Sequence, residues 1–367
     1  MSALPATTRR PTRTLLLVPE IFSSEGGIPR ILRNYLRALC DLGGPDGTVR
    51  LLALNDPSFP ASAFTSLPPG RLESAMACGR RKGRLIREAL RLSRGCDRLV
   101  CGHLFLLPVA WILRRLRPGL RYHVIAHGIE VWRPLRWRER LALRDATSAL
   151  CVSAYTRGEL LRRCPLPEDR ALVLPNALDP SFPLHPGRPL ATCEPIILTV
   201  TRLSSADRYK GVDHLIAALP QVREALPQAR LRIIGRGDDL ARLEGLARQA
   251  GVASAVDFAG YVEDDRLREE LASCRLFALP SNGEGFGLVY LEAMAHGRPC
   301  LAARAGGAPE VLTDATGMLV DYGDVPGLAR AAITALQRAW DSQAILDQVE
   351  PFTYPAFVRR LSALLPA

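Results

Sequence analysis

The sequence lacks an apolar run long enough to cross a bilayer. Its longest apolar stretch covers residues 104–113 and contains Pro108, whereas a membrane-spanning helix needs about 20 residues. The apolar run at 15–18, behind a polar and basic N-terminus, is too short for the core of a signal peptide. We therefore expect a cytoplasmic protein that is soluble or lies on the inner face of the cytoplasmic membrane.

Cysteine pairs with metal-ligand spacing are also missing. The nine cysteines are scattered, their number is odd and no C-x-x-C occurs, which argues against a disulfide framework and for a reducing compartment. No Asp-x-Asp pair stands at an expected strand end and no His/Cys cluster has ligand spacing, so we expect neither a metal nor a cofactor. With 48% apolar and 23% charged residues over 367 positions, the composition is that of a globular protein of about two domains.

Positive charge is concentrated in the first half of the chain. Residues 1–190 contain 30 Lys and Arg against 15 Asp and Glu, whereas residues 191–367 contain 18 against 22. This distribution predicts two units with different partners, of which the basic one favours an anionic surface or substrate. An arginine-rich composition inherited from a GC-rich genome is the alternative explanation.

Two basic segments predict where an anionic membrane surface would bind. Residues 79–98 alternate arginines with Leu and Ile, and residues 132–140 combine arginines with two tryptophans. A basic amphipathic helix can lie on anionic lipid headgroups; the alternative is a core-packing helix with a solvated basic face. Nucleic acid is not expected as a partner, because no groove-reading or base-stacking motif accompanies the charge.

Short strand-like runs alternate with amphipathic stretches along the whole chain, a pattern typical of parallel α/β sheets. The first set of strands is expected at 14–18, 49–54, 98–102, 121–127, 148–153 and 171–175. After a proline-rich linker at 179–189, the second set is expected at 195–200, 230–235, 255–260, 275–280, 298–303 and 317–321. Helices are expected between them, including one at 285–296.

This repetition predicts two Rossmann-like doubly wound domains that face a central cleft, with ligands bound at the carboxyl ends of the strands. We expect an N-terminal acceptor-binding domain over residues 1–186 and a C-terminal donor-binding domain over residues 187–345. Residues 346–367 are expected to form a helix that returns to the N-terminal domain.

The densest candidate site is the segment EGFGLVYLE at 284–292, which follows an expected strand. Glycines just before a helix leave its first N–H groups open for phosphate oxygens. If Glu284 and Glu292 share that helix, they lie about 12 Å apart along its axis, about the length of a nucleotide sugar. Their carboxylates could accept hydrogens from the hydroxyls of a sugar and a ribose; two exposed helix glutamates are the alternative.

Further candidates stand at other strand ends. Arg202 stands at the carboxyl end of a strand and Lys210 at the start of the next helix, where the two cations can converge on a diphosphate and stabilise a departing nucleotide. The Gly26-Gly27 pair permits close approach of the backbone to a ligand. His127 ends a strand and can donate a hydrogen bond to a sugar hydroxyl or carry a proton. Asn176 ends another and could reach phosphate or sugar, or cap a turn.

The chain resembles the family-four retaining glycosyltransferases of the GT-B fold. The resemblance rests on the spacing of Glu284 and Glu292, the signature of that family, and on the order of the other motifs from residue 14 to about 340. It implies that Arg202 and Lys210 hold the donor diphosphate. It also implies that Glu284 binds hydroxyls of the transferred sugar, near a catalytic His127 at the 6-hydroxyl, and that Glu292 binds the ribose.

The remaining donor contacts are also implied by the resemblance. Gly26 and Gly27 would approach the diphosphate, and Tyr261 and Val262 would flank the base. The backbone amides that would meet the phosphates or the sugar are those of Phe286, Gly287 and Leu288.

The sequence therefore predicts an enzyme: a retaining glycosyltransferase that moves a hexosyl group from a UDP- or GDP-sugar to a hydroxyl of a lipid-linked or glycan acceptor, in polysaccharide or glycolipid biosynthesis. The nucleotide sugar is a co-substrate and not a cofactor. No carboxylate nucleophile is placed by the sequence, so same-face attack assisted by the leaving phosphate is the expected route. A sugar-nucleotide epimerase or phosphorylase of the same fold, and a non-catalytic basic membrane-binding protein, are the alternatives.

Overall fold

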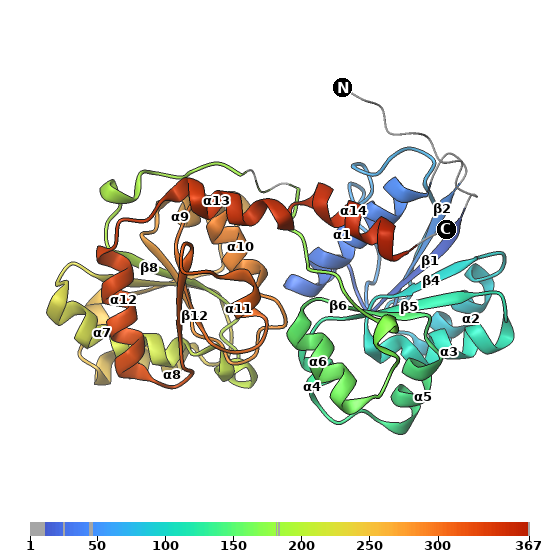
Figure 1. Cartoon of the computed structure of the whole chain (residues 1–367), viewed down its shortest axis with the longest axis horizontal. Helices are drawn as coiled ribbons and strands as arrows, with labels where there is room; N and C mark the ends of the chain where they lie inside the picture. The colour runs from blue at the N-terminus through green and yellow to red at the C-terminus, as the bar shows by residue number, and fades with distance from the viewer. Residues whose placement is uncertain (1–11, 25, 44–46, 181, 183, 366–367) are drawn as a thin grey trace. The chain divides into compact units, whose positions relative to one another are not determined.

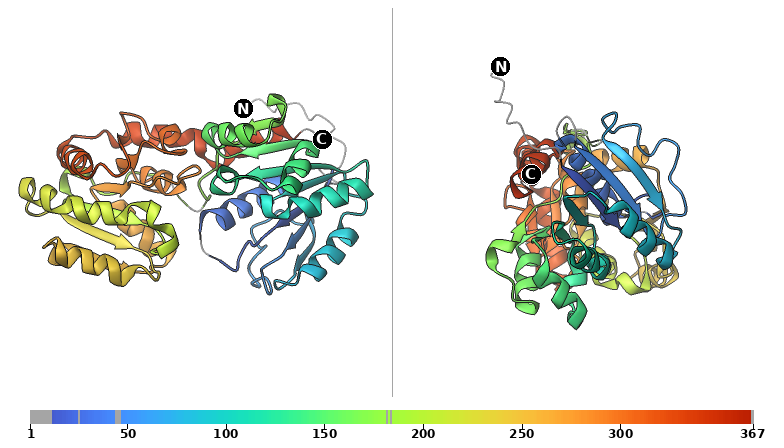
Figure 2. Two further views of the ribbon diagram at one scale, coloured as in Figure 1. Left: turned by 90° about the horizontal axis from the view of Figure 1, so that it is seen from below. Right: turned by 90° about the vertical axis from the view of Figure 1, so that its right-hand side faces the viewer.

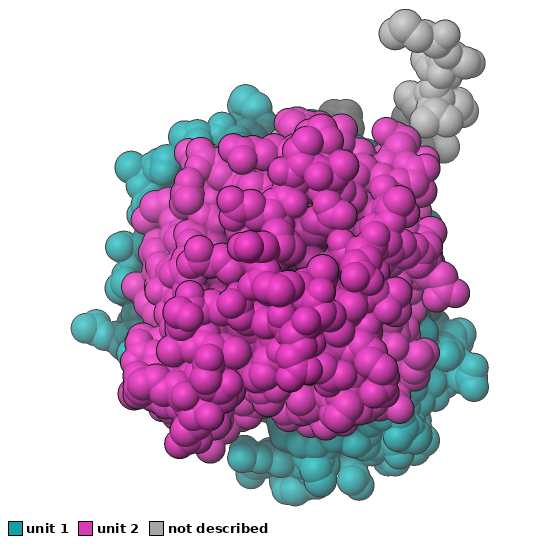
Figure 3. Space-filling view, turned by 90° about the vertical axis from the view of Figure 1, so that its left-hand side faces the viewer, with its two compact units in different colours: residues 1–179, 354–367 teal, residues 180–353 magenta. Residues whose placement is uncertain are grey.

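The computed structural model describes residues 12–24, 26–43, 47–180, 182 and 184–365. The chain divides into two compact units, one formed by residues 1–179 with 354–367 and the other by residues 180–353 (Figure 3). The boundaries predicted from the sequence, after residues 186 and 345, differ from these by several residues.

The first unit is built on a parallel sheet of seven strands in the order β3-β2-β1-β4-β5-β6-β7 (Figure 1). These strands are β1 (Arg13–Val18), β2 (Thr48–Ala53), β3 (Leu72–Ala77), β4 (Arg98–Cys101), β5 (Arg121–Ala126), β6 (Ser148–Cys151) and β7 (Ala171–Val173). All were expected except β3, an edge strand whose residues are half-buried or exposed. Its sequence, LESAMA, lacks the β-branched residues that mark a strand.

Helices cover both faces of this sheet (Figures 1 and 2). Leu15 and Leu17 of β1 belong to a core shared with α2 (Lys82–Leu92), α3 (Leu107–Leu116) and α5 (Trp137–Asp145). The other helices of the unit are α1 (Gly27–Leu42), α4 (Ile129–Trp132), α6 (Ala154–Arg163) and α14 (Tyr354–Leu364). Pro108 lies in the first turn of α3, where a missing N–H costs no helical hydrogen bond.

The last helix of the chain packs against the first unit. The ring of Phe357 in α14 lies 5.0 Å, centroid to centroid, from that of Tyr35 in α1, edge to face. The Tyr354 hydroxyl donates a hydrogen bond of 2.6 Å to the Asp41 carboxylate. These contacts explain why α14, although distant in sequence, belongs to the same unit as α1.

The second unit contains a parallel sheet of six strands in the order β10-β9-β8-β11-β12-β13. They are β8 (Ile196–Val200), β9 (Arg230–Ile234), β10 (Val256–Gly260), β11 (Leu276–Leu279), β12 (Cys300–Ala303) and β13 (Gly317–Val320), each within or close to its predicted range. Its helices are α7 (Val212–Ala225), α8 (Leu240–Gln249), α9 (Asp264–Ser273), α10 (Leu288–Met294), α11 (Ala308–Val311), α12 (Val325–Gln337) and α13 (Ser342–Val349). The predicted fold class, two α/β units with parallel sheets, is confirmed.

No helix among the described residues is both long and apolar enough to cross a membrane. All nine cysteines are free thiols, and all but Cys193 are buried.

A buried histidine in the first sheet should make the fold sensitive to acid. His123 in β5 is 5% exposed, and its Nδ1 lies 2.8 Å from Ser148 Oγ. Burial, with the nearby charges of Arg98 and Arg121, lowers the pKa of His123 to about 3. Between pH 6.5 and 3 the unfolded chain therefore binds a proton that the folded chain does not, so stability falls as the pH falls through this window.

We expect this histidine alone to remove about 2 kcal/mol of unfolding free energy between pH 6.5 and 5. Urea denaturation at the two pH values, followed for the wild type and for His123→Gln, measures the effect. The variant should lose a matching part of the acid dependence. An unchanged dependence would show that His123 is protonated without cost in the folded state.

Candidate active site

Charged side chains meet at the carboxyl edge of the second sheet. Lys210 ends a 3₁₀ helix (Ser205–Lys210) that follows β8, and Glu284 lies in the loop after β11. The Lys210 Nζ is 2.5 Å from Glu284 Oε1, and both side chains are largely buried. Arg202, also after β8, has an exposed side chain whose Nη2 is 3.0 Å from Asp207 Oδ2. The structure thus brings together three of the predicted site residues, and adds Asp207, which the sequence did not reveal.

Close packing of two loops holds the Lys210–Glu284 pair. The amide of Asn282 donates a hydrogen bond of 2.8 Å to the Tyr209 carbonyl. Lys210 Nζ lies 5.2 Å from the centre of the Tyr209 ring. A Cβ at Gly283 would lie 2.6 Å from that same ring, so only glycine lets the loop approach. Burial raises the pKa of Tyr209, which keeps the phenol neutral beside the carboxylate of Glu284.

A second glycine pair shapes the backbone of Glu284. The amide of Gly307 donates a hydrogen bond of 2.8 Å to the Glu284 carbonyl. A Cβ at Gly306 would lie 2.3 Å from that carbonyl oxygen, and one at Gly307 would lie 2.5 Å from the Gly285 oxygen. Sequence reasoning missed this pair, although its position just after β12 is a signal of close backbone approach.

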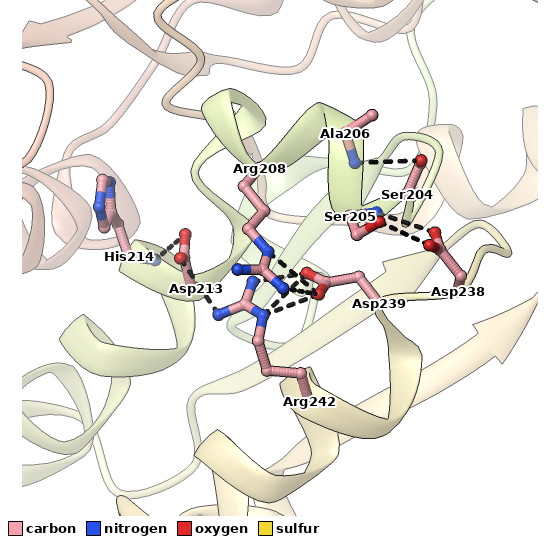
Figure 4. Close-up of polar contacts among 9 residues, drawn as sticks. All are labelled: Ser204, Ser205, Ala206, Arg208, Asp213, His214, Asp238, Asp239 and Arg242. Atoms are coloured by element: carbon pink, nitrogen blue, oxygen red, sulfur yellow. Dashed lines mark hydrogen bonds and ion pairs between the residues drawn. The ribbon is translucent and has the colours of Figure 1, made fainter.

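An ion network fixes the 3₁₀ helix that carries Lys210 (Figure 4). Arg208 Nη2 lies 3.1 Å from Asp239 Oδ1, and Arg242 Nη2 lies 2.5 Å from Asp239 Oδ2. Arg242 also reaches Asp213 of α7 at 3.4 Å. Hydrogen bonds from Arg242 lower the pKa of the Asp239 carboxyl. This network ties the loop after β8 to the first turns of α7 and α8, and it lines a shallow pocket together with Arg202 and Lys210.

The helix expected at 285–296 is shorter than predicted. Helix α10 covers only Leu288–Met294, and its N-cap Gly287 has a φ of 100°. A Cβ there would lie 2.4 Å from the Tyr290 ring, so this position requires glycine. Because the backbone of Gly287 is left-handed, the helix begins only at Leu288. Glu284 therefore lies in the preceding loop, and the predicted helical spacing between Glu284 and Glu292 is wrong. Glu292 itself lies on α10 and is 7% exposed.

The other donor candidates lie around the same edge. Phe286 is buried, with its ring 5.5 Å from that of Phe352, so only its backbone is available to a ligand. Leu288 is half-buried at the start of α10. Tyr261 is exposed and Val262 half-buried, directly after β10.

In the first unit, an aspartate organises the loop before the glycine pair. Asp56 is fully buried, and its carboxylate accepts hydrogen bonds of 2.8–2.9 Å from the amides of Ile21, Phe22 and Ser23. Gly26, with a φ of 134°, is the N-cap of α1, which Gly27 begins. Because Asp56 lies more than thirty residues from its partners, the sequence offered no signal for this role.

His127 directly follows β5 and lies beside another histidine. Its Nε2 is 2.8 Å from the Gly102 carbonyl, which requires the proton on Nε2. In the neutral ring Nδ1 is therefore an acceptor, so the expected donation to a sugar hydroxyl would need the protonated form. The ring of His103 stacks on His127 at 6.0 Å, and burial lowers the pKa of His103. Sequence reasoning overlooked His103.

Asn176 follows β7 in the first unit and is 7% exposed. Its Oδ1 is buried without a hydrogen-bond partner. An unpaired buried acceptor costs roughly 1–3 kcal/mol, so this amide is a candidate for contact with a ligand. Asn176, His127, Gly26 and Gly27 belong to the first unit, and Arg202, Lys210, Glu284, Glu292 and Tyr261 to the second.

The basic segment at 79–98 has its apolar face buried. Leu85, Ala89 and Leu92 of α2 belong to the core of the first unit, so the expectation that this helix offers an apolar face to lipid is wrong. Helix α3 packs against both α2 and α5, and the three form one layer. Their exposed apolar side chains are Ile86, Ile112, Leu116, Trp137 and Leu141, and their exposed cations include Arg87, Arg91, Arg115 and Arg138.

Comparison with known families agrees with this two-unit arrangement. The model of a family described as Glycosyltransferase Family 4 matches residues 25–182, and that of a family described as Glycosyl transferases group 1 matches residues 194–338. Among solved structures, Anabaena HepE in complex with UDP and glucose has a TM-score of 0.75 at 19% identity, covering 95% of this chain and 98% of that one. A lipopolysaccharide outer core galactosyltransferase, WaaB, also has a TM-score of 0.75, at 15% identity and covering 96% and 98%.

Curated relatives are similar in sequence as well. The chain is 35% identical over 236 residues to a GDP-mannose-dependent alpha-(1-6)-phosphatidylinositol monomannoside mannosyltransferase of Mycolicibacterium smegmatis. That match covers 59% of this chain and 61% of the relative, so the chain spans about three fifths of the mannosyltransferase. An alpha-maltose-1-phosphate synthase of the same organism is 30% identical over 342 residues, covering 83% of this chain and 82% of that protein.

Proposed function

The chain belongs to glycosyltransferase family 4, and we propose that it transfers a mannosyl group from GDP-mannose to a hydroxyl of a membrane glycolipid, with retention of configuration. The observation that carries the proposal is the cluster of Arg202, Lys210 and Glu284 at the carboxyl edge of the second sheet. The choice of GDP-mannose and of a glycolipid is supported by the name of the mannosyltransferase relative.

The charges at this edge suit a diphosphate leaving group. Cations placed where negative charge develops stabilise the transition state, so Arg202 and Lys210 would stabilise GDP as the bond between the sugar C1 and the phosphate oxygen breaks. Glu284 would accept hydrogen bonds from the mannosyl hydroxyls. The acceptor oxygen attacks C1 on the face that the phosphate leaves, and its proton passes to the departing phosphate oxygen. These cations take the role that a metal has elsewhere, so we expect transfer to persist in EDTA.

The test is transfer from GDP-mannose to phosphatidylinositol monomannoside presented in vesicles, followed by mass spectrometry and by NMR of the anomeric proton. We expect a product one mannosyl unit larger, with the α configuration. UDP-glucose and UDP-galactose serve as competing donors. A reaction that leaves the glycolipid unchanged but converts the donor to another sugar nucleotide would favour an epimerase. Transfer of the sugar to inorganic phosphate would favour a phosphorylase. The absence of turnover with any donor would favour a non-catalytic protein.

We also propose that the layer of α2, α3 and α5 docks on anionic lipid. Its outer face combines arginines with Leu116 and Trp137, of which the latter is 69% exposed. Basic side chains contribute about 1 kcal/mol each near an anionic surface, and a tryptophan beside them suits the headgroup region. The apolar face of α2 is buried in the core and takes no part in this docking.

Sedimentation with vesicles tests this docking. We expect the protein to bind vesicles that contain about 30% phosphatidylglycerol at least tenfold more tightly than vesicles of pure phosphatidylcholine. Added salt should weaken this binding. The double variant Leu116→Ala/Trp137→Ala should bind about tenfold more weakly. Tyr322→Ala, which removes an exposed aromatic ring from the second unit, is the control. Equal binding to neutral and anionic vesicles would contradict the proposal.

A further inference from the structure

An arginine and a tyrosine form a platform at the carboxyl edge of the second sheet, beyond the cations already described. Arg236 follows β9, and its guanidinium carbon lies 4.8 Å from the centre of the Tyr261 ring, which follows β10. The Tyr261 side chain is 44% exposed. Stacking on an aromatic ring orients the planar guanidinium and its fork of N–H donors.

The backbone fixes this platform relative to Arg202. The amide of Leu203 donates a hydrogen bond of 3.0 Å to the Arg236 carbonyl, and the amide of Gly235 donates one of 2.8 Å to the Gly260 carbonyl. The turns after β8, β9 and β10 are therefore joined side by side.

Glycines on both sides of Arg236 make this joining possible. A Cβ at Gly235 would lie 1.8 Å from the Thr201 carbonyl oxygen, and one at Gly237 would lie 2.0 Å from the Leu203 oxygen. Neither position accepts a larger residue without movement of the neighbouring backbone. Arg236 is consequently the one side chain that this three-residue segment can present to a ligand.

The strand order sets the direction in which a nucleotide sugar would lie. The strands β10, β9, β8 and β11 are adjacent in that order, and neighbouring strands are about 4.8 Å apart, so the outer two are separated by roughly 14 Å. Glu284 stands after β11, the cations Arg202 and Lys210 after β8, and Arg236 and Tyr261 after β9 and β10. A donor with its sugar at Glu284 and its diphosphate at the cations therefore has its base at the platform.

We propose that Arg236, oriented by the ring of Tyr261, selects guanine as the base of the donor. The inference rests on the proposed function, because it assumes a nucleotide-sugar donor in this site. Guanine presents two adjacent acceptors, O6 and N7, that match the arginine fork. Adenine places an amino donor beside N7, and in uracil the ring N3–H separates the two carbonyl acceptors O2 and O4. Each of these bases leaves an arginine donor without a partner.

The experiment is calorimetric binding of GDP, UDP and ADP to the full chain. We expect the wild type to bind GDP more tightly than the other two. Arg236→Ala should weaken GDP binding about 10- to 100-fold, the range expected for one bidentate contact, and should change UDP binding less than threefold. Arg236→Lys, which keeps the charge and loses the fork, should also lose the preference for GDP.

A matched control is available in the same unit. Arg338, at the end of α12, lies 4.0 Å over the ring of Trp340, and α12 leads away from the carboxyl edge because it follows β13 and returns along the sheet. Arg338→Ala removes an equal charge from a similar stack and should leave all three affinities unchanged.

The outcomes separate this inference from the function on which it rests. Equal loss of GDP and UDP binding in Arg236→Ala, or equal wild-type affinity for both, would overturn guanine selection and leave a nucleotide-sugar site standing. A wild type that binds none of the three nucleotides would overturn the proposed function itself. Retained preference for GDP in Arg236→Ala would place the selecting group elsewhere.

Discussion

Lys210→Ala is expected to lower kcat for the proposed mannosyl transfer by about 10²- to 10³-fold, the usual loss when one group that stabilises developing charge is removed. The loss has two sources. The variant lacks the cation beside the departing diphosphate, and it leaves Glu284 without the ammonium group that lies 2.5 Å away. The unpaired carboxylate then repels the anionic donor, so KM for GDP-mannose should rise as well.

The residue type at this position supports a specific role. Lys210 and Lys82 are the only two lysines among the 48 basic residues of the chain, so arginine is the default cation everywhere else. A lysine presents a compact charge with three rotatable donors, whereas an arginine is a larger planar fork. We therefore expect Lys210→Arg to recover only part of the rate.

Steady-state kinetics with saturating glycolipid measure both constants. Arg248→Ala, which removes an exposed cation from α8, is the control for a general loss of positive charge and should behave as the wild type. Circular dichroism tests whether the variant is folded, because removing one partner of this largely buried pair can also destabilise the fold. Turnover within threefold of the wild type would show that Lys210 does not stabilise the departing diphosphate.

The sequence predicted the elements whose pattern is local. The strands of the second sheet are short runs rich in apolar residues, although β9 and β10 also contain charged residues, and such runs are readable without tertiary information. The edge strand β3 was not predicted, because its exposed and half-buried positions tolerate Glu and Ser and so break the apolar pattern. The missing fact was the place of this segment at the edge of the sheet.

The candidate site was predictable to a similar extent. Arg202, Lys210 and Glu284 were recognisable because each follows a strand whose carboxyl end the alternating pattern locates. Asp207 and Asp56 act through partners that only the folded chain brings near them, such as the three amides that Asp56 caps. The start of α10 was misplaced because a glycine with positive φ can end a helix or lie within a loop, and the sequence does not distinguish the two.

The second large effect is expected from a residue that touches no substrate. Gly307→Ala should lower kcat about 100-fold, because its Cβ would lie 2.5 Å from the Gly285 oxygen and 2.9 Å from the Phe286 Cα. Both are backbone atoms, so a rotamer change cannot relieve the clash. The φ of Gly307 is −85°, which alanine adopts without strain, so displacement of the loop is the whole effect.

That loop carries Glu284, and misplacing a reacting group by about 1 Å can cost 10²-fold in rate. We expect kcat to fall more than the GDP affinity, since Arg202, Lys210 and Arg236 stand on other loops. Gly245→Ala in α8, whose Cβ would meet only the Arg248 side chain at 3.9 Å, tests for a general effect of adding a methyl group. If Gly307→Ala is as fast as this control, the added methyl group does not displace Glu284 enough to limit the reaction, and the predicted effect of the clash is wrong.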